Sequence, residues 1–370
     1  MPRNIFIKIK SIKLEIYILV IIAVFNLLAG FIYFGLPGEA IDYYGDAINY
    51  VKGLETPEYS QGIYYRMISR ILNSPLMIFS SAWLASTYEG SLRIMLFQNI
   101  IFYFLLIYVF YKLVFIIFDN SRIAFWATLF FSGNFCMYNY MPTYSSDPGG
   151  WFFLLLSVYF AISYYKKQID SYYYLCILSS IVGLFYKETG GLGMLSLGVL
   201  ILFQETSLKE KIIKISKAAI LFLIPVVIFH GLIYLFFHYS YFTWYSYLLE
   251  SDGSVGLENV NRLKDIIKQP FQIFLIGWYS VFYGLYKSKK NLKKEQLIFL
   301  IALLPWTLSF LLWSSLIMRI MFVLVPFLAI LAGYGLYQIK NNYVRLVIIF
   351  SYLVSNYYIF PILATLGKYY

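Results

Sequence analysis

Long apolar stretches, separated by short polar segments, follow one another along almost the entire chain. Each is as long, or nearly as long, as the roughly 20 residues that a helix needs to cross a hydrocarbon layer of about 30 Å. They fall at residues 14–36, 91–118, 123–140, 151–165, 172–186, 190–204, 218–238, 270–286, 297–314, 317–338 and 346–365. The pattern predicts an all-α, polytopic membrane protein with about 11 transmembrane helices in a single domain, residues 1–370.

The longest interruption, residues 37–90, follows the first apolar run and is too long to be a turn. Within it apolar residues recur at helical spacing in two places. Such spacing predicts two amphipathic helices that lie on the membrane surface and roof a cavity. Their apolar positions are Ala47, Ile48, Val51 and Leu54 in the first, and Tyr64, Met67, Ile68, Ile71 and Leu72 in the second.

Composition excludes a soluble globular protein. Of the 370 residues, 61% are hydrophobic and only 13% are charged, whereas a soluble domain has roughly 25% charged residues. Two cysteines, Cys136 and Cys176, exclude a disulfide scaffold, and two histidines argue against a histidine-rich metal centre.

The distribution of charge predicts the orientation in the membrane. Because Lys and Arg concentrate in cytoplasmic loops, we place the N-terminus inside. Then 19 of the 29 basic residues are cytoplasmic, most densely in KSKKNLKKE at 287–295, and 12 of the 18 acids are outside. We therefore expect a plasma (inner) membrane protein with its active site on the outer, periplasmic side. The net charge of +11 is explained by topology and contact with anionic lipids, so no nucleic-acid partner is expected.

Acidic residues on the outer side are the first candidates for chemistry. Asp42 and Asp46 are four residues apart, so in a helix both carboxylates project from one face. Helix capping by Asp46 is the alternative interpretation. Asp147 stands before Pro148 at the start of the fourth run, a pattern typical of a helix N-cap, and the same geometry directs a carboxylate to the outer interface.

Two further sites combine a cation with helix-breaking or small residues. Lys187 and Glu188 lie between two short apolar runs, before glycines that permit a broken helix. They either neutralise one another or line a functional cavity, since ionisable groups at membrane depth are costly. Arg319 enters the tenth run from outside, seven residues before Pro326. Its guanidinium either extends to water or binds an anion such as phosphate.

In order and sidedness, these residues resemble the integral-membrane C-type glycosyltransferases. The resemblance is carried by Asp46-x-x-x-Tyr50 in the first outer loop, then by Asp147, Lys187 and Arg319. More narrowly, the chain is similar to bacterial relatives of the dolichyl-phosphate-mannose–protein mannosyltransferases. It departs from that group at Ala47, where those enzymes have a second acid.

The resemblance implies a polyprenyl-phosphate-sugar donor with its lipid tail in the bilayer, among membrane lipids, and a lipid, glycan or protein acceptor. Transfer requires a base for the acceptor hydroxyl and a cation for the phosphate leaving group. We expect Asp46 to be the base, with Asp42 as the competing candidate, and Arg319 and Lys187 to bind the phosphate. Asp147 and Glu188 are expected to orient the acceptor or to bind a divalent cation, the one cofactor considered.

Two other classes of protein share parts of this pattern. A lipid-linked glycan flippase or transporter also has many spans and intramembrane charges, but internal repeats are expected there and none is visible. A polysaccharide polymerase or ligase is favoured by the mixed charges of the 239–269 loop, which include Arg262, Lys264 and Lys268.

Overall fold

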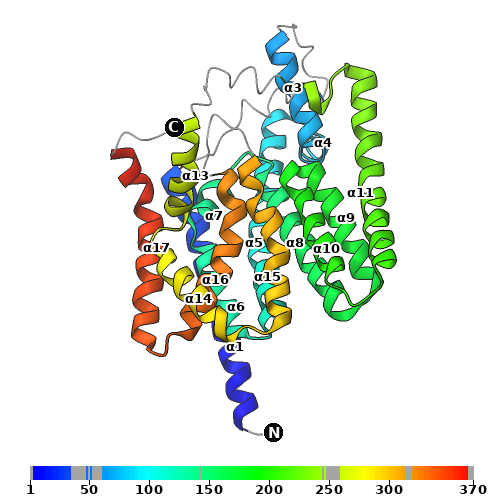
Figure 1. The fold of residues 1–370 in the computed structure, drawn as a ribbon. Helices are drawn as coiled ribbons and strands as arrows, with labels where there is room; N and C mark the ends of the chain where they lie inside the picture. The colour runs from blue at the N-terminus through cyan, green and yellow to red at the C-terminus, as the bar shows by residue number, and fades with distance from the viewer. Residues whose placement is uncertain are drawn as a thin grey trace.

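The chain folds into a bundle of helices in the computed structural model, which describes residues 3–34, 47–48, 51, 61–141, 143–243, 246, 259–312 and 319–365 (Figure 1). All regular secondary structure in these residues is helical, as the sequence predicts. The helices are α1 (Arg3–Phe34), α3 (Gln61–Asn73), α4 (Pro75–Trp83), α5 (Tyr88–Phe118), α6 (Ser121–Ser132), α7 (Phe135–Tyr140), α8 (Asp147–Lys167), α9 (Asp170–Tyr186), η1 (Glu188–Leu192), α10 (Gly193–Leu202), α11 (Leu208–Phe237), α13 (Asn259–Phe274), α14 (Gly277–Asn291), α15 (Lys294–Thr307), η3 (Leu308–Leu312), η4 (Ile320–Leu324), α16 (Val325–Gln338) and α17 (Asn342–Thr365).

Each predicted apolar run contains a helix or a pair of shorter helices, but the number of about 11 crossings is not confirmed. In the described residues, four helical stretches are long and apolar enough to cross a membrane. They are Tyr88–Phe118, Leu208–Phe237, Lys294–Leu312 and Ile320–Gln338. Several other runs are divided, such as 123–140, which the structure breaks between α6 and α7.

Side chains satisfy the backbone groups that the break between α6 and α7 releases. The Asn134 Oδ1 accepts a hydrogen bond from the backbone N–H of Cys136 at 3.0 Å, and the Asn356 Oδ1 accepts one from Phe135 N at 2.9 Å. The Asn134 amide also donates to the Ile273 carbonyl at 2.7 Å. A divided helix is tolerated inside a membrane bundle when its polar groups find such partners.

Small residues bring the helices of the central part of the bundle into close contact. A methyl group on Gly333 of α16 would lie 2.4 Å from the Ala127 Cα on α6, so these two backbones touch. On another side of α16, Gly335 packs against Gly284 of α14 in the same way. The small residues in the tenth run therefore permit close packing, as expected from the sequence.

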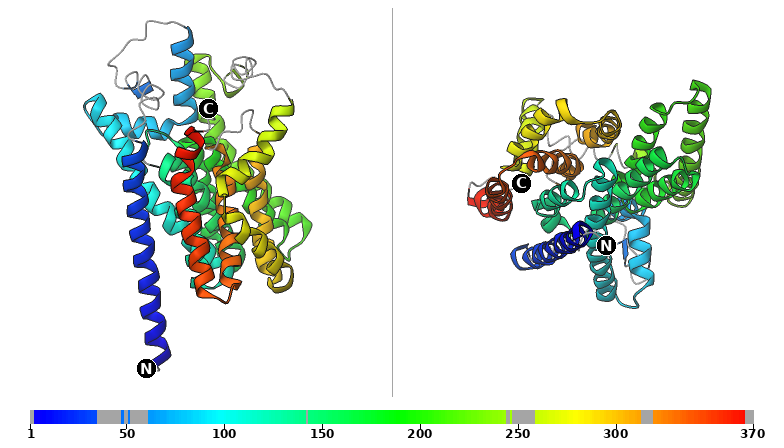
Figure 2. Two further views of the ribbon diagram at one scale, coloured as in Figure 1. Left: turned by 90° about the vertical axis from the view of Figure 1, so that its left-hand side faces the viewer. Right: turned by 90° about the horizontal axis from the view of Figure 1, so that it is seen from below.

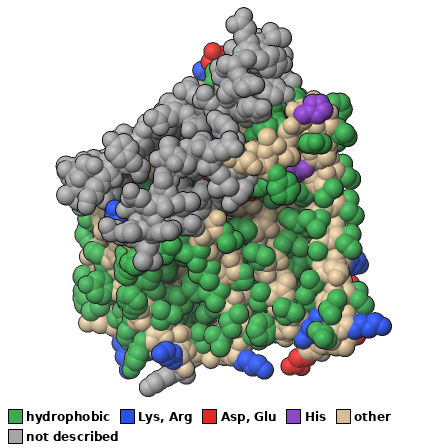
Figure 3. Space-filling view, turned by 45° about the horizontal axis from the view of Figure 1, so that its top comes forward, with side chains coloured by type: hydrophobic (Ala, Val, Ile, Leu, Met, Phe, Trp, Pro, Cys, Tyr) green, Lys and Arg blue, Asp and Glu red, His purple; other side chains and the backbone are tan. Residues whose placement is uncertain are grey.

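One end of the bundle is rich in Lys and Arg. The loops after α5, α8, α10, α14 and α16 lie at the end where α1 begins, and α17 ends at the opposite end (Figures 1 and 2). Lysines and arginines gather along the lower edge in Figure 3, below a flank of apolar side chains. An ion pair at this basic end joins Lys166 Nζ to Asp119 Oδ2 at 3.0 Å. The expected orientation, in which this basic end is cytoplasmic, stays a prediction.

The predicted amphipathic segment 61–73 is a helix, but it does not lie flat. In Figure 2, α3 stands roughly parallel to the bundle at the end opposite the basic loops. The reason is that its apolar face packs on protein: Met67, Ile68, Ile71 and Leu72 are buried in a cluster that includes Tyr144 and Ile233. The first predicted helix lies largely outside the described residues, although Ala47 and Ile48 are buried in that same cluster.

Candidate functional site

The site begins where α8 starts, at the end of the bundle opposite the basic loops. Asp147 is the first residue of α8, and Ser146 occupies the N-cap position without a side-chain capping hydrogen bond. The expectation that Asp147 itself caps the helix is therefore wrong by one residue. Because the Asp147 carboxylate is not used for capping, it is available to pair with a cation; its side chain is only 5% exposed.

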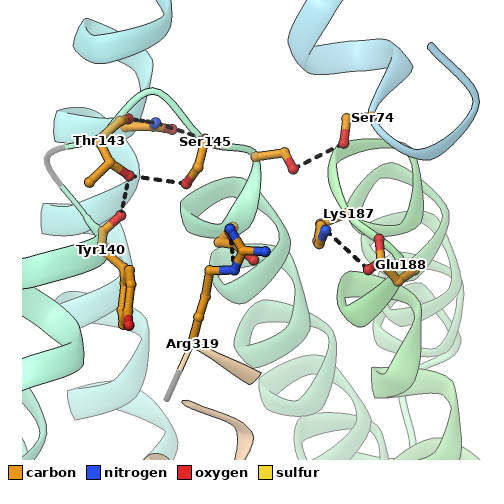
Figure 4. Close-up of polar contacts among 10 residues, drawn as sticks. Ser74, Tyr140, Thr143, Ser145, Lys187, Glu188 and Arg319 are labelled. Atoms are coloured by element: carbon orange, nitrogen blue, oxygen red, sulfur yellow. Dashed lines mark hydrogen bonds and ion pairs between the residues drawn. The ribbon is translucent and has the colours of Figure 1, made fainter. Parts of the chain in front are cut away.

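Arg319 is the cation that Asp147 meets. The Arg319 Nε lies 3.5 Å from the Asp147 Oδ2, and the arginine side chain remains 40% exposed (Figure 4). The Asp147 Oδ2 is buried and has no hydrogen-bond partner, so the contact is a long charge pair and not a hydrogen bond. An aromatic stack holds the segment after Arg319 on α8: the rings of Trp151 and Phe322 have centroids 3.7 Å apart and planes inclined by 9°.

Lys187 and Glu188 form a second ion pair beside the first turn of α8. The Lys187 Nζ lies 3.1 Å from the Glu188 Oε1, and the two side chains are 12% and 14% exposed. Lys187 links α9 to η1 in an extended conformation, which confirms that the helix is broken there. A methyl group on Gly150 would lie 2.5 Å from the Lys187 Cβ, so this backbone packs directly against α8, one turn after Asp147.

The expected residues come together in part. Asp147 and Arg319 meet directly, and Lys187 and Glu188 flank the same helix start (Figure 4). Asp42 and Asp46 lie outside the described residues. Arg319 and Lys187 are each paired with a carboxylate, so the four charges of the two pairs balance.

The two ion pairs differ in how exposed their cations are. Lys187 and Glu188 are close and enclosed, whereas Arg319 makes a longer contact and exposes two fifths of its side chain. Arg319 is therefore the more accessible of the two cations to an incoming anion. The guanidinium suits phosphate because its planar fork can donate to two oxygens at once.

The described residues do not by themselves provide a metal site. They contain no group of three or more His, Cys, Asp or Glu side chains placed to hold a metal ion. Asp147 and Glu188, the two expected ligands, are each engaged by a cation instead. We therefore derive no chemical step through a divalent cation.

Sequence reasoning missed the residues that hold the loop 143–146 before Asp147. Asn99 on α5 donates to two backbone carbonyls of this loop, and the Ser74 hydroxyl donates to the Ser146 hydroxyl at 2.9 Å (Figure 4). Burial raises the pKa of the Tyr144 phenol, while the Arg93 guanidinium on α5 acts in the opposite direction. The available signal was the amide of Asn99, beside Gln98, inside a largely apolar run.

Comparison with known proteins supports the family resemblance. Residues 65–230 match the model of the family described as dolichyl-phosphate-mannose-protein mannosyltransferase. This range contains Asp147, Lys187 and Glu188, whereas Arg319, Asp42 and Asp46 lie outside it. No curated protein matches the chain.

Two solved structures of archaeal oligosaccharyltransferase share the fold. The crystal structure of the Archaeoglobus fulgidus oligosaccharyltransferase in the apo form aligns with a TM-score of 0.59 and 14% identity, over 93% of this chain and 55% of that one. AglB from the same organism, in complex with an inhibitory peptide and a dolichol-phosphate, aligns with a TM-score of 0.54 and 13% identity, over 95% and 56%. This chain thus spans about half the length of those structures. The expected resemblance to membrane C-type glycosyltransferases is confirmed.

Proposed function

We propose that the protein is a membrane glycosyltransferase that moves a sugar from a polyprenyl-phosphate donor to a lipid, glycan or protein acceptor at the outer face of the plasma membrane. The observation that carries this proposal is the meeting of Asp147 and Arg319 at the end of the bundle opposite the basic loops. The family match over residues 65–230 and the dolichol-phosphate in the AglB complex support a lipid-phosphate donor.

Arg319 binds the phosphate of the donor in this proposal. A sugar phosphate gains negative charge on its oxygens as the bond to the sugar breaks, and a cation already in place stabilises that charge. Arg319 is exposed enough to accept a phosphate and is held near α8 by the stack of Phe322 on Trp151. Lys187 adds positive charge from the other side of the helix start, while Glu188 limits how far it can move.

Asp147 orients the acceptor. When phosphate engages the Arg319 guanidinium, it competes with the Asp147 carboxylate for the same cation, and the carboxylate then accepts a hydrogen bond from an acceptor hydroxyl. Asp46 is the general base that removes the proton from that hydroxyl, and Asp42 is the competing candidate for this role. Both belong to the first outer loop, whose Ala47 and Ile48 are buried in the cluster that also contains Tyr144.

The experiment is transfer of labelled mannose from dolichyl-phosphate-mannose by membranes that contain the full-length protein. Arg319→Lys keeps the charge but loses the planar fork, so donor binding and turnover should both fall, turnover by roughly 10²-fold. Asp147→Asn should lower turnover without weakening donor binding, because the carboxylate that competes with the phosphate for Arg319 is removed. A panel of other polyprenyl-phosphate sugars extends the assay if mannose is not the substrate.

A matched control is present at the opposite end of the bundle. Asp119→Asn breaks the ion pair between Asp119 and Lys166, in which the acid is 73% exposed. Because this pair lies far from the site, the variant should transfer sugar at the wild-type rate. Equal losses in Asp119→Asn and Asp147→Asn would contradict the proposed site, and full activity in Arg319→Lys would contradict the phosphate-binding role.

A further inference from the structure

Asn99 is fully buried on α5 and uses its side-chain amide to hold the loop that leads to Asp147. The Asn99 Nδ2 lies 2.6 Å from the Thr143 carbonyl oxygen and 2.9 Å from the Ser145 carbonyl oxygen. Because carbonyl oxygens only accept hydrogen bonds, these partners fix which end of the amide faces the loop. One side chain of α5 therefore holds two points of the loop just before α8 begins.

Other hydrogen bonds complete the attachment of this loop, as Figure 4 shows. The Thr143 hydroxyl donates to the Tyr140 carbonyl at 2.7 Å and lies 3.1 Å from the Ser145 hydroxyl. At the next residue, the Ser146 hydroxyl accepts from Ser74 at 2.9 Å. Asp147 follows directly, so the place of its carboxylate beside Arg319 depends on this network.

The remaining polar atom of Asn99 argues that stability is not the main result of this arrangement. The Asn99 Oδ1 is buried and has no hydrogen-bond partner among the described residues. An unsatisfied buried acceptor loses its interaction with water and opposes the gain from the two donated bonds. The main effect of the Asn99 amide is therefore to fix the geometry of the loop.

We propose that Asn99 is a positioning residue, which acts through Asp147 by fixing the start of α8 so that the Asp147 carboxylate faces Arg319. This inference rests on the proposed function for its effect on turnover. Asn99 touches neither donor nor acceptor, so its loss should lower turnover while donor binding is retained. A displacement of a reacting group by about 1 Å can reduce the rate by as much as 10²-fold.

The test uses the full-length protein in proteoliposomes, with dolichyl-phosphate-mannose as the donor probe. Asn99→Ala should lower kcat by about tenfold and change the donor KM less than twofold. If Asn99 acts through Asp147, adding Asn99→Ala to Asp147→Asn should cause no further loss, since the group being positioned is already inactive. A full additional tenfold loss in the double variant would overturn the proposal.

Asn26 provides a matched control for the loss of a buried amide. It lies on α1 and is also fully buried, but its Nδ2 donates to the Ser132 carbonyl of α6 at 2.5 Å and not to the loop before Asp147. Asn26→Ala should lower thermal stability as Asn99→Ala does, but any effect on kcat should persist in the Asp147→Asn background. Identical behaviour of the two amide variants in both backgrounds would overturn a positioning role for Asn99.

Two further measurements keep the result decisive. Asn99→Asp preserves the shape of the side chain, and a neutral carboxyl can donate one of the two hydrogen bonds, so its kcat should fall between wild type and Asn99→Ala.

If the wild-type protein transfers no sugar from any donor tested, the proposed function fails. Thermal unfolding then tests whether Asn99 and Asp147 are structurally coupled. The changes in Tm from Asn99→Ala and Asp147→Asn should be non-additive; additive changes would overturn the link between them.

Discussion

At the scale of single residues, the site is defined by how its charges are paired. Arg319 and Lys187 each meet one carboxylate, but at 3.5 Å with 40% exposure in the first case and at 3.1 Å with 12% exposure in the second. The greater exposure of the Arg319 side chain makes it the more accessible cation for a phosphate. We therefore predict that Arg319 has a larger part in phosphate binding than the enclosed Lys187.

The roles proposed for the two acids of the first outer loop are separable by substitution. Asp46→Asn keeps the shape of the side chain but removes the base, so turnover should fall by the 10²–10⁴-fold typical of a general base while donor binding persists. Asp42→Asn should be milder. Both are measured by transfer of labelled sugar in membranes with expression verified. Full activity in Asp46→Asn with loss in Asp42→Asn would assign the base to Asp42.

Removing one partner of the Lys187–Glu188 pair should destabilise the protein. The two side chains are 12% and 14% exposed, so Glu188→Gln leaves an enclosed, unbalanced charge, with an expected cost of about 3 kcal/mol. Lys187→Met combined with Glu188→Gln removes both charges and should recover part of the loss. Thermal unfolding in detergent measures both. A double variant that is less stable than either single variant would contradict a stabilising interaction between Lys187 and Glu188.

At the scale of helices, the ends and breaks build the site. Asp147 is placed by the start of α8, Lys187 and Glu188 by the break between α9 and η1, and Arg319 by the segment entering η4. Regular helices could not direct these side chains to one place, because in a continuous helix the residues next to Lys187 would turn away from α8. Glycines at close backbone contacts make the break possible.

The contact between Gly183 of α9 and Gly190 of η1 should tolerate no side chain. A methyl group on Gly190 would lie 2.3 Å from the Gly183 carbonyl carbon, so Gly190→Ala must separate α9 from η1 and displace Lys187. We expect a loss of at least about 2 kcal/mol of stability, typical of overpacking at a rigid contact, together with lower transfer activity.

Gly198→Ala on α10 is the control for this substitution. A methyl group there meets nothing within 4 Å, so the change should be neutral or stabilising by up to about 1 kcal/mol, because alanine favours the helix. The two variants are compared by thermal unfolding. Equal stability of Gly190→Ala and Gly198→Ala would contradict the close contact between α9 and η1.

At the scale of the whole molecule, the bundle separates a basic end from the end that holds the site. The lipid-exposed flank between them is apolar; of the 30 residues of α11, only Ala218 and Ile233 are buried. Charge at one end and chemistry at the other are what a membrane enzyme with an outer-facing site requires. From the distribution of Lys and Arg we predict that the basic end is cytoplasmic.

Cysteine labelling tests this orientation directly. Ser86→Cys lies in the exposed connection between α4 and α5 at the end of the site, and Lys289→Cys lies at the basic end; both side chains are exposed. The native Cys136 and Cys176 are fully buried, so they should not react. In intact cells, a membrane-impermeant maleimide should label the first variant and not the second. Labelling of both, or of Lys289→Cys alone, would contradict the proposed topology.

The linear order of apolar runs, charged loops and helix-breaking residues was enough to determine a helical membrane protein, the places of its helices and its candidate charges. Hydrophobic periodicity and charge asymmetry are local properties, so they can be read from the sequence directly. Only the tertiary structure decided that Asp147 pairs with Arg319 rather than capping α8, and that α3 stands upright because its apolar face packs on protein. It alone also showed that Asn99 holds the loop before α8. Each of these depends on contacts between residues far apart in sequence, and side-chain packing chooses among partners that the linear pattern leaves equivalent.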